Sequence, residues 1–213
     1  DSPGALAASR ASAAWIQNNQ FADGSYVYEY RLDDEATPGG YNVVRHAGVT
    51  MSLYQLAASG DASVLDTADR GLRWMNLNLY RNNGWAGLRD PADGSVRLGA
   101  SALMLAGVLQ RRIASGDAGY DELARSLARG LLALQLPDGA FLNRWDTAAN
   151  APVSGERSKY ATGEAFWALA LMHRAFPGEG WDRPALLTAD YLALSRDDVE
   201  QQKYPPWADQ WAA

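Results

Sequence analysis

Apolar residues recur at a spacing of three and four along most of the chain, which predicts helices. Helices that are apolar on nearly all faces are predicted over 43–58, 97–114 and 161–176. Helices with one apolar stripe and a polar opposite side are predicted over 61–79, 119–136 and 183–195. The two kinds alternate, as expected if fully buried helices form an inner layer that amphipathic helices cover. An alanine-rich helix is predicted before them, near 5–18.

Glycine turns separate these helices. The glycines at 24, 84, 139 and 180 are each followed within two residues by an aromatic residue, at intervals that suit one helical hairpin plus a loop. Asp23, Asp93 and Asp138 all precede a glycine, and we interpret them as turn-forming residues. Longer segments, 25–41, 86–96 and 142–160, lead into the three apolar helices. The long loops are therefore expected to gather at the heads of the inner helices.

Composition narrows the function classes. The 213 residues suit a single domain, 1–213, and 47% of them are apolar. A net charge of −6, with lysine only at 159 and 203, argues against a nucleic-acid partner. No apolar run approaches the roughly 20 residues of a membrane span. Without cysteine there are no disulfides, thiolate metal sites or cysteine nucleophile, and the cellular compartment stays open.

The segment RGLLALQLPDGAF, residues 129–141, is similar to the glutamine–tryptophan repeat of triterpene cyclases. The alternating hairpins with aromatic-bearing Asp-Gly turns resemble the α/α-toroid proteins more broadly. These include six-hairpin glycosidases, polysaccharide lyases, the helical domain of glucuronyl C5-epimerases and protein prenyltransferases. The resemblance implies an all-α fold, an α/α-toroid of two concentric helical layers, with a ligand at the rim of its central cavity.

The chain has fewer helices than six hairpins require. An incomplete ring, a smaller toroid and a domain of a longer protein, with further domains as partners, all fit this number. The terminal WADQWAA is predicted to be part of a further helix, in which Trp207 and Trp211 share one face.

Two branches of the toroid proteins fit the sequence poorly. A cyclase would need a DxDD acid, and only LDDEA, residues 32–36, is present. A prenyltransferase would need an Asp-Cys-His zinc set, and the chain has no cysteine. The histidine at 173 lies in a predicted helix near Phe176 and is interpreted as a core residue. No metal and no cofactor are predicted.

The polar residues at the heads of the apolar helices are the main candidates for chemistry. YNVVRHAG (41–48) places Arg45 and His46 at the head of one helix, and KYATGEAF (159–166) places Glu164 at the head of another. His46 and Glu164 suit acid–base catalysis, and Arg45 suits binding of a carboxylate or a sugar hydroxyl. The alternative is structural: polar side chains at helix starts often bind the neighbouring loop, and Glu164 would either be a capping partner for the Ser158–Tyr160 loop or pair with Arg45.

Aromatic residues near these heads are candidates for sugar binding. In SYVYEYR, residues 25–31, tyrosines alternate with other residues, which predicts a short β-ribbon with the tyrosines at 26, 28 and 30 on one face. Aromatic rings beside a polar cavity suit stacking against sugars, whereas the alternative is packing of the loop on the helices. The candidates for the rim are Tyr26, Tyr28, Tyr41, Trp145 and Tyr160.

The leading hypothesis is a carbohydrate-active or carbohydrate-binding toroid domain, similar to a glycosidase, lyase or epimerase. It would hold an oligosaccharide or another polar small molecule at the rim of its cavity. The alternative is a non-catalytic helical scaffold that binds a peptide or a partner protein through an aromatic groove. A cyclase-like domain for an apolar substrate is disfavoured, because the mouth would carry arginine, histidine and glutamate.

Overall fold

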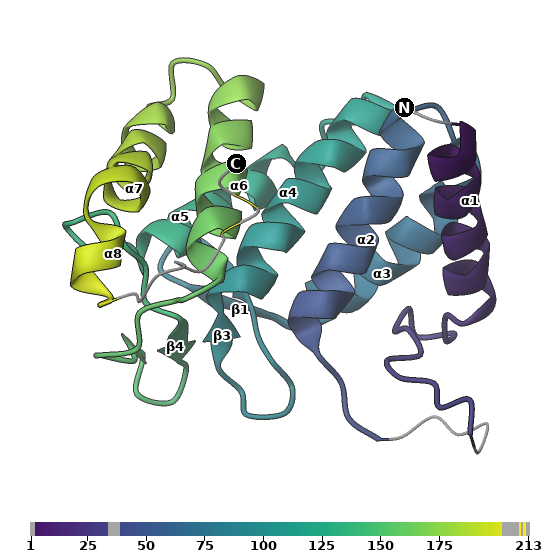
Figure 1. Cartoon of the computed structure of the whole chain (residues 1–213), viewed down its shortest axis with the longest axis horizontal. Coiled ribbons are helices and arrows are strands. Elements are labelled where there is room, and N and C mark those ends of the chain that lie inside the picture. Colours follow the sequence, from purple (N-terminus) through teal and green to yellow (C-terminus); the bar gives the residue numbers. More distant parts are fainter. Residues whose placement is uncertain (1–2, 34–38, 202–208, 210, 212–213) are drawn as a thin grey trace.

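The computed structural model describes residues 3–33, 39–201, 209 and 211 of the chain (Figure 1). The helices are α1 (Pro3–Asn18), α2 (Val43–Ala58), α3 (Leu65–Leu77), α4 (Leu98–Ser115), α5 (Asp121–Leu132), α6 (Ala161–Ala175), α7 (Asp182–Leu194) and α8 (Arg196–Val199). A single 3₁₀ turn, Ala62–Val64, precedes α3. None of these described helices is both long and apolar enough to cross a membrane.

The helices form two layers, as the sequence predicts. α2, α4 and α6 pack side by side as the inner layer, with α4 between the other two. α3, α5 and α7 each pack on the inner helix that precedes them in the chain, so the core is a row of helical hairpins. α1 and α7 lie at opposite ends of this row (Figure 1).

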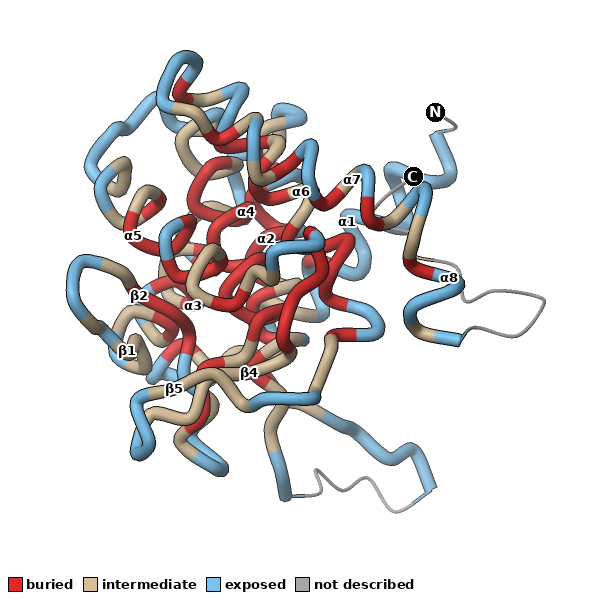
Figure 2. The backbone as a smooth tube through the Cα atoms, turned by 90° about the vertical axis from the view of Figure 1, so that its left-hand side faces the viewer, coloured by how far each residue is buried: buried red, intermediate tan, exposed pale blue. Residues whose placement is uncertain are grey.

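Burial explains which helices are inside. Every residue of α4 from Leu98 to Leu109 is buried, whereas α5 buries chiefly one stripe that includes Leu127 and Leu131. Figure 2 shows the buried backbone concentrated in α2, α4 and α6. The prediction from periodicity is therefore confirmed for the inner layer and for the amphipathic α3 and α5.

Short strands occur where helices were predicted to continue and in the long loops. β1 (Leu79–Asn82) pairs antiparallel with β2 (Trp85–Leu88), so α3 ends at Leu77 instead of 79. β3 (Val96–Arg97), β4 (Arg144–Asp146) and β5 (Ala151–Pro152) form a second antiparallel sheet.

The predicted tyrosine ribbon is wrong in position. Residues 27–30 belong to no strand, and Tyr26 makes only an isolated bridge with Gln20. The Val27 N–H donates to the Asn19 carbonyl oxygen at 2.9 Å, so Tyr26 and Val27 pair with the residues that follow α1 and the tyrosines form no ribbon of their own.

The Asp-Gly turns are built in the same way, as expected from the sequence. Asp23 Oδ1 accepts hydrogen bonds from the Ser25 N–H at 2.9 Å and from the Ser25 hydroxyl at 2.7 Å. Asp93 and Ser95 repeat this arrangement. These aspartates therefore shape turns.

Glycine is required at two of these turns because the backbone of an outer helix comes very close. A side chain at Gly24 would collide with the Arg70 carbonyl of α3, and one at Gly139 would collide with the Leu187 carbonyl of α7. Both glycines also have positive φ, +94° and +91°. The repeated turn thus fastens one hairpin to the outer helix of the next.

Two further expectations concern the C-terminal part of the chain, and the structure tests one of them. His173 is exposed on α6, with Nδ1 3.9 Å from Asp182 Oδ1, so its interpretation as a core residue is wrong. Trp207 lies outside the described residues, so its pairing with Trp211 stays a prediction. Trp211 itself packs against Trp167 of α6, with ring centroids 5.5 Å apart.

Candidate functional site

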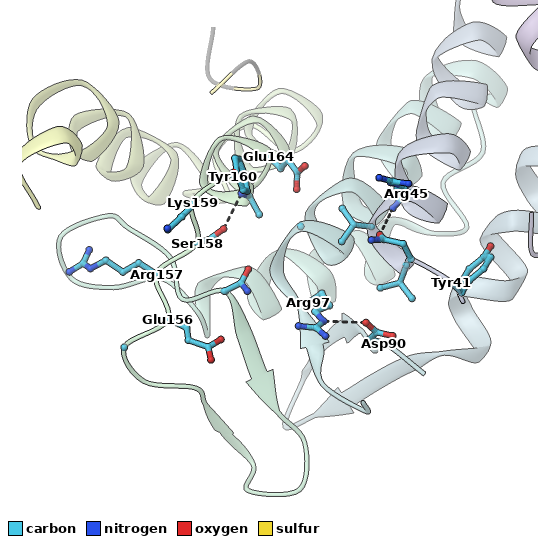
Figure 3. A pocket seen from close by; sticks show the side chains of 17 residues that line it. Tyr41, Arg45, Asp90, Arg97, Glu156, Arg157, Ser158, Lys159, Tyr160 and Glu164 are labelled. Atoms are coloured by element: carbon cyan, nitrogen blue, oxygen red, sulfur yellow. Dashed lines mark hydrogen bonds and ion pairs between the residues drawn. The ribbon is translucent and has the colours of Figure 1, made fainter. Parts of the chain in front are cut away.

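An open cavity of about 760 Å³ lies at the heads of α2, α4 and α6 (Figure 3). It forms where the long loops meet the N-termini of the inner helices, which is where the sequence places the candidate residues. Its charged and aromatic lining residues are Tyr41, Arg45, Asp90, Arg97, Glu156, Arg157, Lys159, Tyr160 and Glu164.

Helix capping fixes the orientation of these heads. The Asn42 side chain caps α2 by accepting the Arg45 N–H at 3.0 Å. The Ser158 hydroxyl accepts the Ala161 N–H at 2.9 Å at the start of α6. Capping stabilises each helix start, so Arg45 and Glu164 are held in the first turns beside the opening, on opposite sides of it (Figure 3).

Glu164 is the least ordinary group in the cavity. Glu164 is only 7% exposed, and its Oε2 atom has no hydrogen-bond partner among the described residues. A helix N-terminus favours a charged carboxylate, but burial outweighs this effect here. Burial, with a smaller contribution from the charge of Asp209, raises the pKa of Glu164 to about 7. Both protonation states are therefore populated near neutral pH.

Most other charges of the lining are paired. Arg97 Nε lies 3.2 Å from Asp90 and Arg97 Nη2 lies 2.6 Å from Asp93. Arg144 donates two hydrogen bonds to the Glu156 carboxylate, at 2.8 and 2.9 Å, and this holds the pKa of Glu156 below its usual value. The cavity thus carries one carboxyl group that resists ionisation and another that is held ionised.

Arg45 differs from these arginines. Its guanidinium donates to the Tyr28 hydroxyl at 3.2 Å and lies 5.3 Å from the centre of the Tyr28 ring. No carboxylate in the described part of the chain forms an ion pair with it. Its exposed guanidinium has further N–H donors that suit a ligand's hydroxyl or anionic groups.

The predicted aromatic residues separate into groups. Tyr41 and the exposed Tyr160 line the large cavity. Tyr26 and Tyr28 instead line a small neighbouring cavity of about 140 Å³, which shares Tyr41 with the large one. Trp145 is absent from the lining of either cavity and packs edge-on against Trp85, with ring centroids 5.1 Å apart.

His46 lies behind Tyr41, outside the large cavity, and is 2% exposed. Its Nε2 lies 2.9 Å from the Gly71 carbonyl oxygen and its Nδ1 lies 2.5 Å from the Tyr41 hydroxyl. Because a carbonyl only accepts, Nε2 carries the proton and Nδ1 accepts from Tyr41. Its ring also stacks on Trp74 at 4.3 Å.

Burial lowers the pKa of His46 to about 4, so the ring is neutral at physiological pH. Its ring contacts the cavity lining through the Tyr41 hydroxyl. The sequence predicted the helix head on which His46 lies but not the side to which its ring points. The contacts of the ring agree with the alternative interpretation, in which it binds neighbouring segments.

Several lining residues were missed at the sequence level. Arg97 is the N-cap residue of the second inner helix, in GSVRLGAS, whereas Arg45 and Glu164 are the third and fourth residues of their helices. Its place at a helix head was a usable signal. Glu156 and Arg157 carried none, since they lie in an irregular loop whose path depends on tertiary contacts. No group of three or more histidine, aspartate or glutamate side chains in the described part of the chain is arranged to hold a metal ion.

Known structures share this architecture. No protein-family model matches the sequence, and no curated protein sequence matches it. A sugar epimerase from a ruminal bacterium superposes with a TM-score of 0.74 at 14% identity, covering 98% of this chain and 59% of the epimerase. The cellobiose 2-epimerase of Spirochaeta thermophila gives a TM-score of 0.68 at 14% identity, over 99% of this chain and 59% of that one.

An inactive variant of an α-1,6-mannanase of Salegentibacter, in complex with α-1,6-mannotetrose, also superposes. Its TM-score is 0.58 at 12% identity, over 89% of this chain and 70% of the mannanase. The chain thus spans about three fifths of the epimerases it resembles. At such low identity the likeness concerns the fold alone, and the chain has the fold of the α/α-toroid proteins.

Proposed function

We propose that the cavity binds an oligosaccharide and that Glu164 exchanges a proton with the bound sugar. One observation carries this proposal: a buried carboxyl group with a free oxygen and a pKa of about 7 borders an open polar cavity. A general acid or base works best when its pKa is close to the working pH. The sugar epimerases and the mannanase that share the fold support a carbohydrate as the ligand.

Two of the three carboxyl groups of the lining suit complementary roles. Glu164, whose pKa is raised, is the proton donor, and Glu156, whose pKa is lowered by Arg144, is the ionised partner. Pairs of titratable groups with pKa values pushed apart supply the acid and the base in sugar chemistry. Glycoside cleavage uses such a pair.

The remaining candidates act in binding and positioning. Arg45 donates hydrogen bonds to sugar hydroxyls, and the rings of Tyr41 and Tyr160 offer flat apolar faces for stacking. His46 is a positioning residue, because it fixes the Tyr41 hydroxyl at 2.5 Å from its Nδ1. Tyr26 supports the same ring through its N–H, which donates to Tyr41 Oη at 3.0 Å.

Tyr28 and Trp145 have more distant proposed roles. Tyr28 orients Arg45 through its hydroxyl. Trp145, in the strand that follows the Asn143 of the lining, stabilises the loop that reaches the cavity.

The test uses a panel of manno- and gluco-oligosaccharides. Calorimetry measures their binding, and analysis of the sugar products measures turnover. Glu164→Gln should lower turnover by roughly 100-fold or more while retaining affinity for the same sugar. Asp197→Asn, on the exposed surface of α8, is the matched control and should change neither. If the wild-type protein binds no sugar of the panel at millimolar concentration, the proposal is wrong and a peptide-binding or protein-binding scaffold becomes the leading hypothesis.

A further inference from the structure

Asp209, from the last few residues of the sequence, contacts the head of α6. Its Oδ2 accepts the Gly163 N–H at 3.0 Å, and its side chain is only 7% exposed. Asp209 Oδ1 lies so close to Gly163 that any side chain at position 163 would collide with it. The glycine directly before Glu164 is thus what allows this carboxylate to approach the helix.

Two more contacts hold Asp209 in place. Arg196 of α8, itself buried, donates from Nη1 to Asp209 Oδ2 at 3.1 Å and also contacts the Lys159 carbonyl. Trp211 packs on Trp167, one helical turn beyond Gly163 on α6. The described C-terminal residues are therefore fastened to α6 at two successive turns.

This arrangement changes the surroundings of Glu164. The free N–H groups at the start of α6 would stabilise a charged Glu164, since a helix N-terminus attracts negative charge. Ser158 takes the Ala161 N–H and Asp209 takes the Gly163 N–H, so neither is available to Glu164. Asp209 also brings a second negative charge to the same helix turn.

We propose that Asp209 is a positioning residue that, by occupying the head of α6, adds to the effect of burial and favours the protonated form of the neighbouring Glu164 side chain. This inference rests on the role proposed above for Glu164. It adds a residue that does not line the cavity and that lies 45 positions further along the chain.

Asp209 is not the only charged group near Glu164, because further charged side chains line the same cavity. The cavity brings Arg45 from α2, the Arg97–Asp90 pair from the segment before α4, and Arg157, Lys159 and the Arg144-bound Glu156 from the loop before α6. Arg196 offsets part of the Asp209 charge. Removing the Asp209 charge leaves Arg196 with less compensation, so the balance around Glu164 shifts toward the ionised form.

The experiment measures the protonation of Glu164 itself. In protein labelled with ¹³C-glutamate, the side-chain carbonyl resonance of Glu164 is assigned by its loss in Glu164→Gln and then titrated from pH 4 to 9. Asp209→Asn should lower the pKa of Glu164 by roughly 0.5–1 unit. Gly163→Ala should lower it in the same direction, because the added methyl group displaces Asp209 without removing any charged group.

Two controls match these variants. Asp197→Asn removes an exposed carboxylate from α8, and Gly48→Ala adds a methyl group inside α2 that meets Leu103 at an ordinary 3.6 Å. Neither should move the Glu164 titration. Circular dichroism should show the same helical content in all four variants.

The outcomes separate this inference from the proposed function. If the Glu164 titration is unchanged in both Asp209→Asn and Gly163→Ala, Asp209 only fastens the C-terminal segment and the inference is wrong. If the titration moves as expected while the wild-type protein binds no sugar, the positioning role stands and the proposed function fails. If sugar turnover is present, its loss at high pH should begin at a lower pH in both variants.

Discussion

The Oε2 atom of Glu164 occupies the space that a side chain at position 99 would fill. Gly99 lies in the first turn of α4 and Glu164 in the first turn of α6, so two inner helices meet closely at the floor of the cavity. The position of the Glu164 carboxyl group therefore depends on the glycine at position 99 as well as on α6.

Gly99→Ala should therefore displace the Glu164 carboxyl group. The new methyl group would collide with Oε2 and lie 3.1 Å from the Ala161 Cβ. We expect a destabilisation of roughly 1–3 kcal/mol, a changed Glu164 titration and weaker turnover of any sugar that the wild type processes. Gly48→Ala, measured by the same thermal unfolding and titration, is the control; equal behaviour of the two variants would contradict the close contact.

Glu164→Gln should alter how stability depends on pH. The folded pKa of Glu164, about 7, lies above the usual glutamate value of 4.5. The folded state therefore holds this proton more tightly, and the free energy of unfolding falls as pH rises from 4.5 to 7, by up to roughly 3 kcal/mol. The glutamine variant cannot ionise at this position, so its free energy of unfolding should not show this decrease. In urea titrations the variant should be more stable than the wild type at pH 8, and the difference should become smaller toward pH 4.5.

His46→Gln should show the opposite dependence. The folded pKa of His46 is lowered from 6.5 to about 4, so its contribution to stability is complete above pH 6.5 and is lost as pH falls toward 4. At pH 7 we expect the variant to be destabilised by roughly 1–3 kcal/mol, because the Gly71 and Tyr41 bonds and the Trp74 contact are disturbed. The difference from the wild type should shrink below pH 6.5. A constant difference across pH 4–7 would show that His46 ionises freely in the fold.

Arg45→Ala should weaken ligand binding with little effect on the fold. Arg45 is exposed and makes no ion pair with a described residue, so its loss should change the unfolding free energy by no more than about 0.5 kcal/mol. Affinity for a bound sugar should fall by roughly tenfold, about 1.4 kcal/mol. Arg45→Lys, which keeps the charge but loses the fork of donors, should recover only part of it in calorimetry.

Periodicity predicted the fold well because burial controls it directly. The all-round apolar character of residues 98–109 required a helix with neighbours on every side, and α4 has them. Turn chemistry was equally local, since Asp23 and Asp93 bind residues only two positions away.

The site was harder to predict because direction and long-range contacts decide it. Arg45 and His46 are adjacent in sequence, yet one faces the opening and the other is buried against Trp74 and Gly71. Helical periodicity separates neighbours by about 100°, but the face that meets the cavity depends on where α3 packs. The Asp209 contact with Gly163 joins residues 46 positions apart and leaves no local pattern.

The central place of α4 between α2 and α6 has a consequence for cooperativity. Each hairpin packs chiefly on its neighbours in the row, so unfolding can begin at the two ends, whereas α4 is released only when contacts on both sides are lost. α1, whose one buried residue is Ala13, should open first. Amide hydrogen exchange should therefore be slowest in α4, faster in α2 and α6, and fastest in α1. The cavity floor formed by Gly99 would then persist through local openings that already disorder the ends of the row.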